Sequence, residues 1–124
     1  MLLNDFFEII NLSTSQDDKC ASVQIKLNAA HDIFKGHFPD APVVPGVCII
    51  QIIKEILSEI IKKDIMLTEA DEIKFHNAIV PNINPVLNLD FKINLSETFV
   101  AAIVKITFDE TTFCQFKGKF GIGH

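Results

Sequence analysis

The sequence predicts the α+β fold class, with about six antiparallel strands arranged around one long helix. Two patterns carry this prediction. Apolar residues recur at helical spacing between Val47 and Lys63, and the segments on either side alternate apolar with polar residues or are rich in β-branched and aromatic ones. The chain has 124 residues, of which 48% are hydrophobic, so we expect a single domain with one core over residues 1–124.

The strands are expected both before and after the helix. Cys20 to Asn28 alternates most regularly, as is typical of a half-buried strand, and a polar turn from Ser13 to Asp18 precedes it. Residues 109–111 form the expected connection of a hairpin. The expected strands are Phe6 to Leu12, Cys20 to Asn28, Glu72 to Val80, Pro85 to Leu95, Phe99 to Asp109 and Thr112 to Ile122.

The expected helix from Val47 to Lys63 is apolar around most of its circumference, so we expect the sheet to wrap around it. Three prolines and two glycines exclude regular structure through most of Ala29 to Gly46. Pro45 and Gly46 mark the start of the helix, and lysines at positions 62 and 63 suit the negative end of its dipole.

The charge and the composition exclude several classes of protein. A net charge of -5 argues against a nucleic-acid-binding protein. Lys54, Glu55 and Glu59 interrupt the longest apolar stretches, so none can span a bilayer. The first residues include Asp5 and Glu8 and do not resemble a signal peptide, and three widely spaced cysteines suit reduced thiols. We therefore expect a soluble, cytoplasmic protein.

All eleven basic residues are lysines, so arginine clamps for phosphate or carboxylate groups are absent. An acidic partner such as a carrier protein would need a local lysine patch, and Lys74, Lys117 and Lys119 are the candidates. Solvated surface lysines are the favoured interpretation of these three residues.

The loop before the helix carries the residues best suited to chemistry. Pro39, Pro42 and Pro45 stiffen the loop that contains His37, and this loop leads directly into the helix. The first turn of a helix has free backbone amides and a partial positive charge, which suit a thioester carbonyl and hold an enolate oxygen better still. A histidine beside them moves protons near neutral pH. The arrangement therefore suits proton abstraction next to a carbonyl group.

Each of these residues also has a structural interpretation. Taken alone, His37 is more often a loop histidine that caps a backbone carbonyl, and Gly46 can simply satisfy special backbone angles. Gln51 is the sole polar residue between Val43 and Ile53, and a lone buried amide is as often a satisfied core group as part of a site. No two histidines have clear metal-ligand spacing, so we expect no metal and no cofactor.

The loop and helix start resemble a known signature. Gly36-His37-Phe38-Pro39, followed by Pro42 and then Pro45-Gly46-Val47, looks like the motif of the bacterial 3-hydroxyacyl-acyl carrier protein dehydratases. Looser similarity extends to residues 72–75, 80–81 and 116–118. The resemblance implies a hotdog fold, in which a curved antiparallel sheet wraps a long helix. It also implies dimers, often assembled further, with two sites at each dimer interface.

The same resemblance implies roles for individual residues. His37 corresponds to the catalytic histidine, and backbone amides around Gly46 and Val47 would hold the thioester carbonyl. Phe38 and Pro45 belong to the part of the motif that binds substrate, and the acyl chain would occupy an apolar tunnel. The implied substrate is a 3-hydroxyacyl thioester of fatty acid or related acyl-chain metabolism, carried on acyl carrier protein or coenzyme A. The implied reaction forms an enoyl thioester with loss of water and without a cofactor.

Gln51 departs from the family pattern, because relatives carry a glutamate or aspartate on the helix fourteen positions after the histidine. A carboxylic acid can give a proton to the departing hydroxyl, whereas an amide can only form hydrogen bonds. We therefore retain Gln51 beside His37 as a catalytic candidate that positions the hydroxyl or a water. Glu55, one helical turn further on, is expected to join a polar stripe with Ser58 and Lys62 rather than to replace the missing acid.

Asp40 is a smaller departure, since many relatives have glycine there. Two alternatives to a dehydratase stay open. One is a hotdog thioesterase, in which a polar helix residue orients water. The other is a non-catalytic subunit that binds an acyl thioester or completes a hetero-dimer with an active relative, and the exchange of the acid for Gln51 motivates it.

Overall fold

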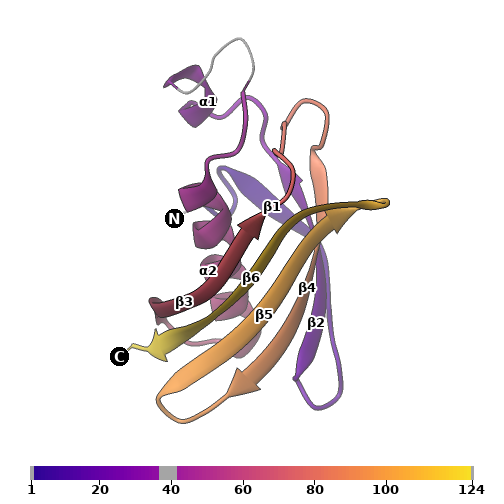
Figure 1. Ribbon diagram of the computed structural model, residues 1–124. Helices are drawn as coiled ribbons and strands as arrows, with labels where there is room; N and C mark the ends of the chain where they lie inside the picture. Colours follow the sequence, from indigo (N-terminus) through magenta and orange to yellow (C-terminus); the bar gives the residue numbers. More distant parts are fainter. Residues whose placement is uncertain (1, 37–41, 124) are drawn as a thin grey trace.

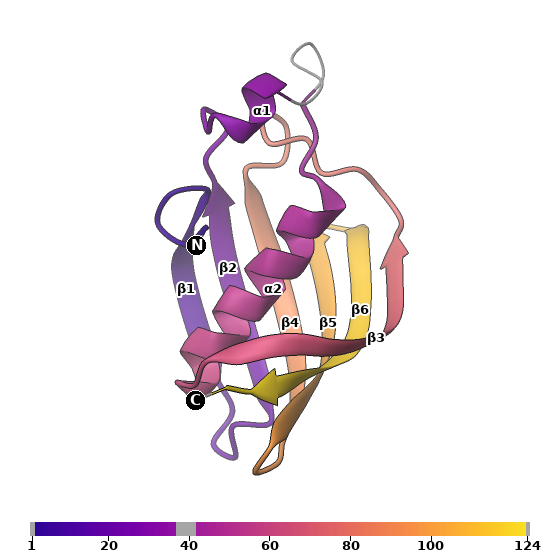
Figure 2. The same cartoon turned by 90° about the vertical axis from the view of Figure 1, so that its left-hand side faces the viewer.

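The computed structural model describes residues 2–36 and 42–123 and shows a six-stranded antiparallel sheet curved around a long helix, α2 (Gly46–Ile61) (Figure 1). The strand order is β1-β2-β4-β5-β6-β3, so β1 and β3 form the two edges. A second view shows α2 lying across the concave face of this sheet (Figure 2). The strands are β1 (Phe7–Thr14), β2 (Cys20–Leu27), β3 (Ile65–Phe75), β4 (Val86–Leu95), β5 (Phe99–Phe108) and β6 (Thr111–Ile122). This architecture agrees with the predicted hotdog fold.

The core lies between α2 and the inner face of the sheet. Alternate residues of β4 and β5 point inward and are buried, while their neighbours face outward, as expected for strands with one covered face. The helix contributes one continuous buried side. The buried residues of these three elements are Leu87, Leu89, Phe91 and Ile93 in β4, Val100, Ala102, Val104 and Ile106 in β5, and Cys48, Ile49, Ile52, Ile53, Glu55, Ile56 and Leu57 in α2. This packing fixes α2, and with it the residues of its first turns.

The helix begins at Gly46, directly after Pro45, whose backbone is extended. Proline fixes its own φ angle and cannot donate a backbone hydrogen bond, so it suits a helix boundary. The helix ends where Lys62 adopts a left-handed conformation with φ 58°, and the Lys62 N–H donates to the Ser58 carbonyl over 2.8 Å. The observed helix therefore agrees with the predicted one to within two residues at either end.

The prediction for β3 was wrong. The alternation predicted a strand from Glu72 to Val80, whereas β3 runs from Ile65 to Phe75. As an edge strand it pairs with β6 alone, most of its residues are exposed, and its register shifts twice, so the period-two pattern is lost. After Phe75 the chain leaves the sheet, and the Ile79 carbonyl accepts a hydrogen bond from Val44 N–H over 2.9 Å.

Two further features were not predicted. A short helix, α1 (Ile33–Gly36), lies within the segment expected to be irregular. Gly118 in β6 pairs with the irregular part of β3. A Cβ atom at Gly118 would clash with the carbonyl oxygen of Glu69 and with the Phe116 ring. Glycine is therefore required for β3 to approach β6 this closely.

Candidate functional site

The first turn of α2 presents free backbone donors. The N–H groups of Cys48 and Ile49 donate to the Pro45 carbonyl over 3.0 and 3.2 Å. The N–H groups of Gly46 and Val47 precede them and have no acceptor among the residues that the structure describes. In the single chain Val47 is 80% exposed, whereas Val44 and Cys48 on either side of it are buried. Two donors and the positive end of the helix dipole therefore lie at a part of α2 with an exposed side chain.

Phe75, which sequence reasoning did not single out as a site residue, lies against the start of α2. A Cβ atom on Gly46 would lie 3.2 Å from the Phe75 ring, so the glycine lets the ring approach the helix. Phe75 is the last residue of β3 and is 54% exposed. The signal that could have found it was its place at the end of the Glu72 to Phe75 similarity. Its ring forms an apolar wall beside the free amides.

The loop that precedes α2 is held where it joins the helix. Val44 is buried, and its N–H donates to the carbonyl of the buried residue Ile79. The predicted site residues His37 and Phe38, and the departure at Asp40, lie outside the described residues. Pro45 and Gly46 lie at the start of the helix, as predicted.

Gln51 forms a hydrogen bond with Glu55 one turn further along α2. The Gln51 Nε2 atom donates to Glu55 Oε2 over 2.8 Å, and the Gln51 side chain is half-buried. Glu55 was expected in a polar stripe with Ser58 and Lys62, whereas it is buried and bound to backbone donors and to Gln51, so this expectation was wrong. Its side chain is only 6% exposed. The error has a physical cause, since a carboxylate enters a protein interior when enough donors surround it, and those donors are backbone groups that no side-chain pattern reveals.

The donors come from the N-terminal turn, residues 2–7, which lies beside α2 (Figure 2). The Leu2 N–H donates to both carboxylate oxygens of Glu55 over 2.9 and 2.8 Å, and the Leu3 N–H donates to Oε1 over 2.8 Å. Successive backbone N–H groups that converge in this way form an anion-binding concavity. Together with Gln51 they use about all the acceptor positions that a carboxylate offers.

The N-terminal turn is itself well held. The Leu2 carbonyl accepts hydrogen bonds from Asp5 N–H over 3.1 Å and from Phe6 N–H over 2.7 Å, and Asn4 supplies the left-handed residue with φ 68°. On its other side, Asp5 Oδ2 lies 3.1 Å from His31 Nε2. His31 Nδ1 in turn accepts the N–H of Ile33, the first residue of α1. The turn therefore connects α2 with the start of α1.

The cysteines do not supply a nucleophile at this site. Cys48 lies in the first turns of α2, but its burial raises the pKa of the thiol. Burial likewise raises the pKa of Cys114 to about 11. Both groups are therefore thiols rather than thiolates at neutral pH, and the thiolate is the nucleophilic form. Among residues 2–36 and 42–123, no cluster of three side chains could hold a metal ion.

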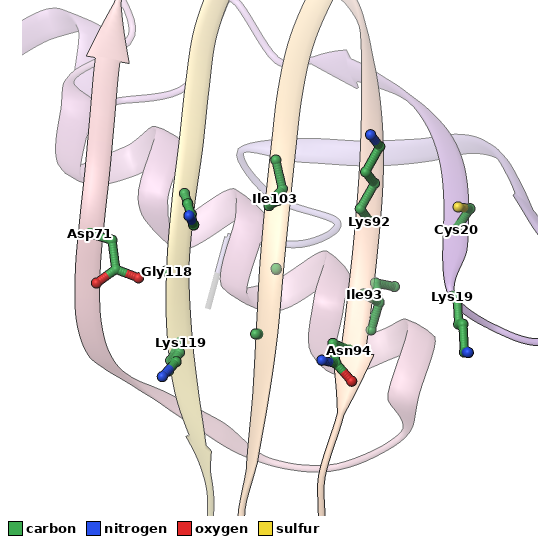
Figure 3. A pocket seen from close by; sticks show the side chains of 12 residues that line it. Lys19, Cys20, Asp71, Lys92, Ile93, Asn94, Ile103, Gly118 and Lys119 are labelled. Atoms are coloured by element: carbon green, nitrogen blue, oxygen red, sulfur yellow. The ribbon is translucent and has the colours of Figure 1, made fainter.

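A pocket of about 410 Å³ opens on the other side of the sheet from α2 (Figure 3). Lys117 and Lys119 line it together with Lys19 and Lys92, around the exposed side chain of Ile103. Acidic residues lie among these lysines, since Glu72 is in register with Lys117 and Glu69 with Lys119. Lys74 lies 3.3 Å from Glu72, and both side chains are exposed. The three candidate lysines therefore lie on a sheet face of mixed charge, which agrees with solvated surface lysines.

Comparison with known proteins identifies the family. The model of the ApeI-like family, described as ApeI dehydratase, matches residues 13–117. The chain belongs to the ApeI-like dehydratase family. No curated protein matches it significantly. Within the part that the structure describes, no helix of this family member is long and apolar enough to cross a membrane.

Several solved structures share the fold of this ApeI-like chain. The dehydratase heterocomplex ApeI:P from Xenorhabdus doucetiae matches with a TM-score of 0.70 and 22% identity, over 91% of this chain and 96% of that one. The smu.793 protein from Streptococcus mutans, bound to acetyl CoA, matches with a TM-score of 0.68 and 10% identity, over 99% and 93% of the two chains. A hypothetical thioesterase with coenzyme A from Streptococcus pneumoniae matches with a TM-score of 0.66 and 15% identity, over 94% and 85%. At these identities the likeness shows the hotdog fold.

The first prediction concerns the buried carboxylate. Glu55→Ala leaves the N–H groups of Leu2 and Leu3 and the amide of Gln51 without their acceptor, so we expect the free energy of unfolding to fall by about 2–4 kcal/mol. Urea unfolding followed by circular dichroism measures this change, because the chain has no tryptophan or tyrosine for fluorescence. Glu59→Ala, at an exposed position of the same helix, is the control and should change stability by less than about 0.5 kcal/mol. Equal effects of the two substitutions would contradict the role of Glu55.

Proposed function

We propose that this ApeI-like protein is a lyase that removes water from a 3-hydroxyacyl thioester to give an enoyl thioester. The observation that carries the proposal is the pair of N–H groups at Gly46 and Val47, which have no acceptor in the described part of the chain and directly follow the histidine-containing loop. Gln51 lies about 7.5 Å further along the helix axis, at the position where relatives carry an acid. Membership of the dehydratase family supports the same reaction.

The proposed mechanism begins with the thioester carbonyl accepting hydrogen bonds from Gly46 and Val47. These bonds stabilise the negative charge that develops on the oxygen when His37 removes the proton from the α carbon. The enolate then expels the hydroxyl group from carbon 3, which takes up a proton and leaves as water while the carbon–carbon double bond forms. Because an amide supplies no proton, the protonated His37 returns its proton to this hydroxyl. Gln51 holds the hydroxyl during the transfer.

The proposed substrate is carried on a pantetheine thiol, as part of either acyl carrier protein or coenzyme A. The coenzyme A-bound relatives of the same fold support this choice of chemistry. An acyl chain of fatty acid or related metabolism would extend into an apolar tunnel. We retain the cytoplasm as the proposed compartment, since Cys20, Cys48 and Cys114 are all free thiols.

We further propose that the working unit is a dimer formed along β3. This strand is a sheet edge whose outer hydrogen-bonding groups are open to a second strand. Met66 is 71% exposed on it, and Phe75 at its end is 54% exposed beside Gly46, while Val47 in the first turn of α2 is 80% exposed. A second copy laid along this edge would cover apolar surface and enclose the start of α2 in one step. A related subunit could take the same place, and the name of the ApeI:P heterocomplex supports that alternative.

The dimer predicts a specific response to substitution. Met66→Glu places a charge at the proposed interface, so we expect the dissociation constant of the dimer to rise at least about tenfold. Sedimentation equilibrium measures it. Ile103→Glu, which adds the same charge on the outer face of the sheet, should leave the dimer intact. If the native protein sediments as a single chain, the homodimer is rejected. If a related subunit with a carboxylate at the corresponding position then forms a two-chain assembly with it, the hetero-dimer is favoured.

Turnover tests the reaction itself. We expect the native protein to convert 3-hydroxyacyl thioesters of coenzyme A or acyl carrier protein into species lighter by one water, as read by mass spectrometry. His37→Ala should lower kcat by about 10²–10⁴-fold because the proton carrier is lost. His76→Ala is the matched control, since His76 contacts Gln115 on the surface, and it should keep native activity. Release of free thiol without dehydration would identify a thioesterase instead.

The residue at position 51 can be tested by restoring the acid. Gln51→Glu alone places a second carboxyl 2.8 Å from Glu55 and removes a charge-assisted hydrogen bond, so we expect it to lose about 1.5–3 kcal/mol of stability. The double variant Gln51→Glu, Glu55→Gln exchanges the two groups and keeps one amide and one carboxyl. We expect it to regain stability and to raise kcat by about 10²–10⁴-fold. A folded double variant that is no faster than the native protein would show that proton supply does not limit the rate.

A further inference from the structure

We infer that Glu55 is a positioning residue that holds the amide of Gln51 with its carbonyl oxygen toward the substrate, so that the site selects a hydroxyl over a ketone at carbon 3 of the acyl chain. This inference rests on the proposed function and adds the specificity of the same site. It follows from the hydrogen bonds around Gln51 and Glu55.

The orientation of the Gln51 amide follows from the chemistry of its partner. A carboxylate has no hydrogen to donate and only accepts hydrogen bonds. The Gln51 atom that lies 2.8 Å from Glu55 Oε2 must therefore be the nitrogen. The opposite orientation would place two oxygens with their lone pairs against each other at that distance. Gln51 Oε1 consequently points away from Glu55.

The carboxylate that imposes this orientation is itself fixed. Oε1 accepts the N–H groups of both Leu2 and Leu3, and Oε2 accepts the Leu2 N–H as well as Gln51. The Leu2 and Leu3 donors are main-chain groups of a turn that is closed by its own hydrogen bonds to the Leu2 carbonyl. Glu55 is only 6% exposed, so water competes little for it. The Gln51 amide is therefore preorganised before any substrate binds.

The selectivity follows from the half of the amide that Glu55 does not contact. The Gln51 oxygen is an acceptor, and a substrate hydroxyl at carbon 3 can donate its hydrogen to it. A ketone at the same carbon has only lone pairs to offer, so it would meet the Gln51 oxygen without a hydrogen between them. A site that offers only a hydrogen-bond acceptor binds a ligand without a donor more weakly, because the acceptor is then left unpaired. We expect the discrimination to be at least about tenfold in the dissociation constant.

Binding of two unreactive ligands tests the inference. The probes are the amide analogues of 3-hydroxybutyryl- and 3-oxobutyryl-pantetheine, in which nitrogen replaces the thioester sulfur, and calorimetry gives both dissociation constants. The native protein should bind the hydroxy ligand at least about tenfold more tightly. In Glu55→Gln, the new amide keeps its oxygen on the Leu2 and Leu3 N–H groups and turns its nitrogen to Gln51, whose amide rotates. The preference should then fall to about one or reverse, whereas Glu59→Gln should keep the native ratio.

A second measurement uses the native protein alone. The Gln51 side-chain amide hydrogen bound to Glu55 should exchange with solvent at least about tenfold more slowly than those of the exposed Gln16, as followed by nuclear magnetic resonance. Equal exchange of the two side chains would overturn the inference even if Glu55→Gln failed to fold.

The outcomes separate the inference from the function beneath it. If the native protein dehydrates its substrate and the Glu55→Gln variant keeps the native preference for the hydroxy ligand, the inference alone is overturned. A native protein that binds neither ligand and turns over no acyl thioester overturns both.

Discussion

The enclosure of α2 by the curved sheet is the constraint on which the rest of this structure depends. The apolar side of the helix packs against the inward-facing residues of the strands. This packing fixes the helix along its length. Its first turn is then fixed as well, including the N–H groups of Gly46 and Val47, which have no acceptor within residues 2–36 and 42–123. A helix on a mobile surface could not hold such donors at one point, and electrostatic stabilisation of a developing charge requires donors that need no reorganisation.

The second consequence of this enclosure is the environment of Glu55. Its position on α2 brings it among buried residues, where a carboxylate would be costly without partners. The N-terminal turn supplies those partners through Leu2 and Leu3, and Gln51 completes them. The amide of Gln51, at the position where the resemblance implies an acid, is therefore part of a connected polar network inside the protein. Such networks are most stable when their buried atoms are satisfied, and among the described residues no buried side-chain nitrogen or oxygen lacks a hydrogen-bond partner.

The sequence predicted those parts of the fold that depend on side-chain periodicity. Strands β2, β4, β5 and β6 and helix α2 each have one covered face, and their alternation or helical spacing records it. The edge strand β3 was misplaced because it is mostly exposed and twice irregular, so nothing in its pattern marks where it begins. The burial of Glu55 was missed for a related reason. Its position on the helix was known from the sequence, but its partners are backbone N–H groups more than fifty residues away.

The N-terminal turn binds the Glu55 carboxylate through backbone N–H groups, so this contact depends little on which residues occupy the turn. Every amino acid except proline carries a backbone N–H, so the hydrogen bonds to the carboxylate do not require leucine at positions 2 and 3, whose side chains serve instead to pack against the core. Family members with dissimilar openings to their chains can therefore share this arrangement. In an alignment, an acidic residue at the position of Glu55 would indicate which relatives to examine for a carboxylate bound by backbone N–H groups.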